Sequence, residues 1–291
     1  MKSLLTFSLC FLLGAVGISA QQLELPQKSP KAEVSYIVGL TKVTINYSSP
    51  AVHDREIWGQ LVPYGEVWRA GANEATTVEF STDVKVEGEN LAAGRYAFFL
   101  IPEKEGKWTA IFNKVADQWG AYNYDEGKDA IRVKVETKTA NDNEERLNYS
   151  IVDQAIDRGY IRFGWGTKRA YILFRADVMA QVANNVKKTF DATPDADKWS
   201  VYAAASDFYA DNGEPLKALD FAERSIKLDE NSRNLWAKAK AEAKMDKYKD
   251  AVKSAKKALQ VGSKAENDRF YNNYNKQMTA RIAEWEEMLN K

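Results

Sequence analysis

Residues 62–77 combine a turn, an aromatic–cation pair, a glycine and polar side chains within an otherwise apolar pattern. The candidate ligand-binding residues of this stretch are Trp68, Arg69, Asn73 and Glu74. The last three would offer a ligand hydrogen-bond donors and acceptors. The alternative is a structural corner between strands, in which Gly71 adopts a backbone angle closed to other residues and the Asn73 side chain ties down its neighbours.

A second stretch, residues 118–124, places aromatic rings beside amides, an arrangement that suits stacking on a sugar or peptide face. Its candidate binding residues are Trp119, Tyr122 and Asn123. The alternative is again structural, because polar groups in β domains usually satisfy hydrogen bonds of the fold. Convergence of the two stretches in one open pocket would favour a binding site.

Catalytic motifs are missing from the sequence. His53 is the only histidine, so a hydrolase triad or a multi-histidine metal site would have to be formed around this one residue. Beside Asp54, His53 is typical of a turn residue. The sequence contains no nucleophile elbow, phosphate-binding loop or zinc-protease motif. We therefore assign no catalytic residue, metal ligand or cofactor and favour a non-enzymatic protein. A hydrolase with paired carboxylates such as Glu74 or Asp117, about 5 to 9 Å apart, stays open.

The residues that must position these side chains alternate between apolar and polar from Glu33 to Asp177. Period-two alternation in short runs, interrupted by Gly, Pro, Asn and Asp, predicts antiparallel strands. About ten such runs predict an all-β antiparallel sandwich or barrel. Residues 96–101 are apolar on both faces and predict a central strand.

After Asp177 the period changes to that of helices, and residues 179–291 predict an all-α tail. Ala218 and Ala251 match 33 residues apart, and Tyr202 and Trp236 match 34 residues apart, which is typical of a tetratricopeptide-like array. A first helix is expected near residues 178–190 and a capping helix from Glu266. Two repeats are fewer than the three that usually stand alone, so we expect the tail to pack on the β domain or on a partner.

The first twenty residues contain one cation, an apolar run and a small residue at the end, which predict a cleaved secretory signal peptide over 1–20. Cleavage near Ala20 removes Cys10, the only cysteine, and excludes thiol catalysis, zinc–cysteine sites and disulfides in the mature chain. No later segment predicts a membrane span. The 41 basic and 41 acidic residues balance, so the charge does not favour nucleic acid. We expect a periplasmic or secreted protein.

Three segments carry a resemblance to a known family: Ser29-Pro30-Lys31-Ala32, residues 61–77 and residues 118–124. Together they resemble the bacterial domain of unknown function 2911 over about residues 25–178. The resemblance implies one β-domain fold unit, and it implies an exported protein of Bacteroidota-type bacteria. It implies no activity.

Three functional hypotheses follow. The first is a non-enzymatic protein whose β domain binds a ligand or partner and whose tail binds another protein or peptide. The second is carbohydrate binding by the β domain through Trp119, Tyr122, Trp68 and Arg69, motivated by the alternating aromatic and amide side chains. The third is a cell-envelope hydrolase with paired carboxylates.

Overall fold

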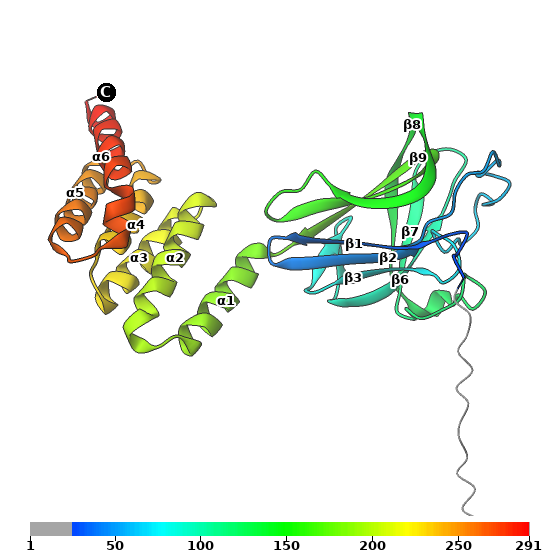
Figure 1. The fold of residues 1–291 in the computed structure, drawn as a ribbon, viewed down its shortest axis with the longest axis horizontal. Coiled ribbons are helices and arrows are strands. Elements are labelled where there is room, and N and C mark those ends of the chain that lie inside the picture. Colours follow the sequence, from blue (N-terminus) through cyan, green and yellow to red (C-terminus); the bar gives the residue numbers. More distant parts are fainter. Residues whose placement is uncertain (1–24, 291) are drawn as a thin grey trace, which may run out of the picture.

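The computed structural model describes residues 25–290, which form a β domain followed by a helical tail (Figure 1). The predicted signal peptide, residues 1–20, lies outside the described residues. Within the described part, no helix is both long and apolar enough to cross a membrane.

The β domain is one nine-stranded antiparallel sheet in the order β1-β2-β3-β6-β7-β8-β9-β4-β5. The strands are β1 (Lys31–Val38), β2 (Thr41–Ser48), β3 (Thr76–Phe80), β4 (Val84–Val86), β5 (Glu89–Leu91), β6 (Gly94–Ile101), β7 (Trp108–Asn113), β8 (Asp129–Val152) and β9 (Arg158–Ala176). The predicted all-β antiparallel domain is confirmed, with nine strands where the alternation suggested about ten. The apolar segment 96–101 lies in β6, between β3 and β7, as predicted.

The sheet curls, so that strands far apart in the strand order face each other. The space between them is filled by one main hydrophobic core. Phe80 of β3 and Phe174 of β9 are separated by 5.6 Å between ring centroids, and neither exposes more than 1% of its surface. Alternate residues of β2, such as Val43 and Ile45, are completely buried in this core. Their neighbours along β2 therefore point to the outer face of the sheet.

The tail contains helices α1 (Val178–Ala192), α2 (Lys198–Asp211), α3 (Pro215–Leu228), α4 (Ser232–Ala243), α5 (Tyr248–Lys264) and α6 (Arg269–Leu289). Helix pairs α2–α3 and α4–α5 follow one another, and α6 packs on α4 and α5. Helices α2 and α4 begin 34 residues apart, at positions 198 and 232. The helical tail is thus confirmed, whereas its assignment to the tetratricopeptide class stays a prediction.

Helix α1 joins the two parts. Val178 is 4% exposed and packs on the main core, and a Cβ atom at Gly39 would lie 2.5 Å from its Cγ2. Gln181 Nε2 donates to Thr41 Oγ1 at 3.0 Å and to Thr82 Oγ1 at 2.8 Å. The later helices α3–α6 stand away from the sheet (Figure 1). Docking of the tail on the β domain is therefore confined to its first helices, and a partner for the rest stays a prediction.

Candidate functional site

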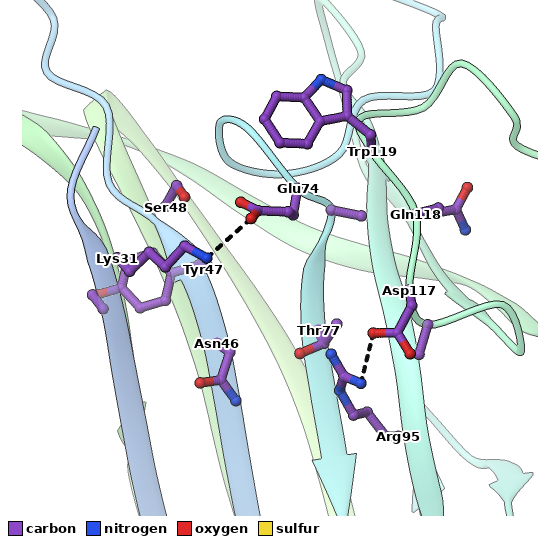
Figure 2. A pocket seen from close by; sticks show the side chains of 13 residues that line it. Lys31, Asn46, Tyr47, Ser48, Glu74, Thr77, Arg95, Asp117, Gln118 and Trp119 are labelled. Atoms are coloured by element: carbon purple, nitrogen blue, oxygen red, sulfur yellow. Dashed lines mark hydrogen bonds and ion pairs between the residues drawn. The ribbon is translucent and has the colours of Figure 1, made fainter. Parts of the chain in front are cut away.

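A hollow of about 610 Å³ lies on the outer face of the sheet, over β1, β2, β3 and β6 (Figure 2). Its volume falls within the range of roughly 300–1,000 Å³ that is typical of small-molecule sites. Its lining combines three alanines with the side chains labelled in Figure 2, which are Lys31, Asn46, Tyr47, Ser48, Glu74, Thr77, Arg95, Asp117, Gln118 and Trp119. We call this hollow the outer groove.

The floor of the outer groove is made by neighbouring strands. Asn46 of β2 pairs with Thr77 of β3, and Thr77 pairs with Ala97 of β6. These residues share the outer face because Ile45 and Val78, next to them in sequence, point into the core. Asn46 is exposed, so its amide is available to a ligand.

One wall of the groove is the segment between β7 and β8, residues 114–128. Asn113, which is fully buried, holds its base: Nδ2 donates to Asp125 O at 2.9 Å and to Asp129 Oδ1 at 2.8 Å, and Oδ1 accepts from Val115 N at 3.0 Å. Tyr124 anchors it further by donating to Asp129 Oδ2 at 2.6 Å. Burial and the neighbouring Asp129 carboxylate both raise the pKa of the Tyr124 phenol, which stays protonated as a donor.

The two sequence stretches meet through main-chain hydrogen bonds. Ala75 N donates to Gln118 O at 3.0 Å, and Gly120 N donates to Asn73 O at 3.2 Å. An isolated bridge accordingly pairs Glu74 with Trp119. This pairing places a carboxylate and an indole at the same end of the outer groove (Figure 2).

Two ion pairs flank the groove. Lys31 Nζ lies 3.0 Å from Glu74 Oε1, and Arg95 Nη1 lies 2.8 Å from Asp117 Oδ1. The pKa of the Glu74 carboxyl is lowered, first by a hydrogen bond to its own backbone and then by Lys31, so it is a carboxylate at neutral pH. Both carboxylates can accept hydrogen bonds from a ligand, and both cations can donate them.

Trp119 adds a stacking surface to the groove, and Gln118 is held by a hydrogen bond within the wall. The Trp119 side chain is 58% exposed at the groove, an unusual position for an indole without a partner. Gln118 Nε2 donates to Val115 O at 2.7 Å, while Gln118 Oε1 is buried without a hydrogen-bond partner among the described residues.

Of the residues that the sequence singled out, Glu74 and Trp119 line the groove and Asn73 supports it. Asn73 Nδ2 donates to Ser29 O at 3.4 Å and to Ser48 Oγ at 3.3 Å. The Asn73 side chain thus ties neighbouring segments together by hydrogen bonds, as the structural alternative predicted. Asn73 itself has a positive φ of 58°.

The expectation for Gly71 was wrong: it is not among the residues with positive φ, whereas the adjacent Ala70 has a φ of 50°. Gly71 is required for space instead. A Cβ atom there would lie 2.8 Å from Thr76 Oγ1 and 3.2 Å from Ser48 O.

The other predicted residues lie outside the groove lining. Trp68 stacks on Trp165 at 5.8 Å and packs against the main core, because its backbone pairs with Leu100 and turns the ring inward. Arg69 is half-buried, and its Nε has no hydrogen-bond partner in the described chain. Tyr122, 81% exposed, and Asn123 lie on the same segment as Trp119 but do not line the hollow.

Sequence reasoning missed several lining residues, namely Lys31, Asn46, Thr77 and Arg95. Lys31, Asn46 and Thr77 are outward polar positions in the alternation of β1–β3, and Arg95 is an outward position of β6. The sequence does not show that these positions form one surface, because that depends on the strand order, which places β1, β2, β3 and β6 side by side. Among the described residues, no group of three His, Cys, Asp or Glu side chains is arranged to hold a metal ion.

The fold and the groove define a chain with a curled antiparallel β domain that carries an open polar site and continues into a helical tail. A family model described as a protein of unknown function, DUF2911, matches residues 29–174, and the chain belongs to this family. No curated protein and no solved structure matches it.

Proposed function

We propose that the β domain binds glycans in the outer groove. The observation that carries this proposal is the exposed Trp119 ring beside Glu74, Gln118 and Lys31. Sugars present apolar C–H faces that stack on aromatic rings and hydroxyls that hydrogen-bond with carboxylates and amides. Both kinds of group stand in one open hollow, as a glycan-binding site requires.

The electrostatics of the groove favour binding over hydrolysis. A glycosidase needs one carboxylic acid with a raised pKa to protonate the leaving oxygen. Glu74 has a lowered pKa, and Asp117 is paired with Arg95. Glu74 is therefore not prepared to act as a general acid, and the protein that we propose is non-enzymatic.

We place this binding protein in the periplasm or outside the cell of a Bacteroidota-type bacterium. The support is the pattern of residues 1–20 and the resemblance of the β domain to exported proteins. N-terminal sequencing of the mature protein should begin near Gln21. An N-terminus at Met1 in the purified native protein would contradict export by cleavage.

The helical tail has a second proposed role, contact with a partner protein. Two hollows of about 370 and 250 Å³ share Lys240 and Arg281, and the stacked rings of Trp236 and Trp285 lie beneath them. A photo-crosslinking amino acid at Gln277, which lines the smaller hollow, should capture a discrete partner in cells. The same label at Gln260, exposed on α5, should capture none, and equal capture at both positions would contradict the role.

Glycan binding is tested directly with the mature chain on an array of neutral, amino and acidic glycans. Trp119→Ala should abolish the binding that the wild-type protein shows. Tyr122→Ala is the matched control, since it removes an exposed aromatic ring from the same segment outside the groove. If no glycan binds, or if both variants behave alike, the proposal fails.

A further inference from the structure

The outer groove continues as a polar strip along β1–β3. The register pairs Lys31 with Ser48 in a first row and Glu33 with Asn46 in a second row. It pairs Ser35 with Thr44 in a third row. The second and third rows extend onto β3, where Thr77 pairs with Asn46 and Glu79 pairs with Thr44.

The third row is polar across four strands. Ser35, Thr44, Glu79 and Arg95 are successive register partners on β1, β2, β3 and β6. Ser35, Glu79 and Arg95 are exposed and Thr44 is half-buried. Rows on one face are two residues apart, so the strip from the first row to the third is about 13 Å long.

This strip is longer than a single sugar ring and offers hydrogen-bonding groups throughout. A monosaccharide stacked on Trp119 would leave the third row without contact. We infer that the outer groove binds an extended glycan chain, with one unit on Trp119 and later units along the rows; this inference rests on the proposed function.

The charges of the strip indicate which chain it accepts. Four carboxylates, those of Glu33, Glu74, Glu79 and Asp117, stand along it. Lys31 and Arg95 are its only cations among these rows and the groove lining. The excess of negative charge repels an acidic polymer, so the chain carries no acidic groups.

Calorimetry with the mature protein tests the inference with three soluble probes: β-1,4-linked glucose oligomers, β-1,4-linked N-acetylglucosamine oligomers and α-1,4-linked galacturonate oligomers, each from one to six units. In at least one neutral series the hexamer should bind more than tenfold more tightly than the monomer, and galacturonate should bind more weakly. Glu79→Gln should lower the hexamer-to-monomer ratio, and Glu89→Gln, at an exposed site on β5, should not.

The outcomes separate the inference from the function on which it rests. Binding that depends on Trp119 but is equally tight for monomer and hexamer would overturn the extended chain and leave glycan binding intact. A ratio unaffected by Glu79→Gln, or tighter binding of galacturonate, would also overturn it. Absence of binding in all three series would overturn both proposals.

Discussion

Replacing Asn113 with alanine should destabilise the β domain by roughly 2–4 kcal/mol. Asn113 is fully buried and makes three hydrogen bonds, to Asp125 O, Asp129 Oδ1 and Val115 N. A neutral hydrogen bond contributes about 0.5–1.5 kcal/mol net, and one to a charged group about 1.5–3 kcal/mol. The sum is about 2.5–6 kcal/mol, and water that enters the vacated space reduces it, because all three bonds are only partly buried.

Urea denaturation followed by far-ultraviolet circular dichroism measures this loss as a lower midpoint at unchanged slope. Asn123→Ala is the matched control, because Asn123 is exposed on the same segment and its side chain makes no hydrogen bond within the described chain. The control should change the free energy of unfolding by less than about 0.5 kcal/mol. If Asn113→Ala also costs less than about 1 kcal/mol, our account of how the groove wall is anchored is wrong.

Two further substitutions test the junction and the tail. Gly39→Ala should cost about 1–3 kcal/mol, since Gly39 has a φ of 60° and the new Cβ would lie 2.5 Å from Val178 Cγ2; an unchanged unfolding midpoint would contradict the close contact. Glu242→Gln should stabilise the tail at pH 7, because burial raises the pKa of the Glu242 carboxyl. In the wild-type protein the buried carboxyl is protonated below the unfolded pKa near 4.5, and this stability is lost as the pH rises through the raised folded pKa. The gain in melting temperature of Glu242→Gln over the wild type should therefore vanish near pH 4. An equal gain at both pH values would contradict burial as the cause.

The sequence predicted the fold class well because periodicity reports burial directly. Val43 and Ile45 alternate with polar neighbours, and β2 buries them as that pattern indicates. Val178, where the period changes to that of helices, begins α1. Strand order is a different kind of information, because hydrogen bonds between distant segments determine it and no local pattern records it.

The site was predicted only in part, because composition marks unusual residues but does not show which way their side chains point. Glu74 and Trp119 stood out through composition, and they do meet at the groove. Trp68 stood out equally, yet its backbone pairing with Leu100 directs the ring into the core. Which side of a strand faces inward at an irregular corner depends on that pairing. Composition alone therefore could not distinguish the exposed ring from the buried one.

The central claim, that the outer groove binds glycans, is tested most directly by nuclear magnetic resonance of the tryptophan indole N–H groups. The chain has eight tryptophans, and Trp119 is the one that lines the outer groove. On titration of the mature protein with neutral oligosaccharides, the Trp119 indole resonance should shift with saturation, while those of the buried Trp108 and Trp165 and of Trp236 in the tail stay in place. A Trp119 resonance that does not move with any neutral oligosaccharide, or binding that moves only the tail resonances, would contradict the account.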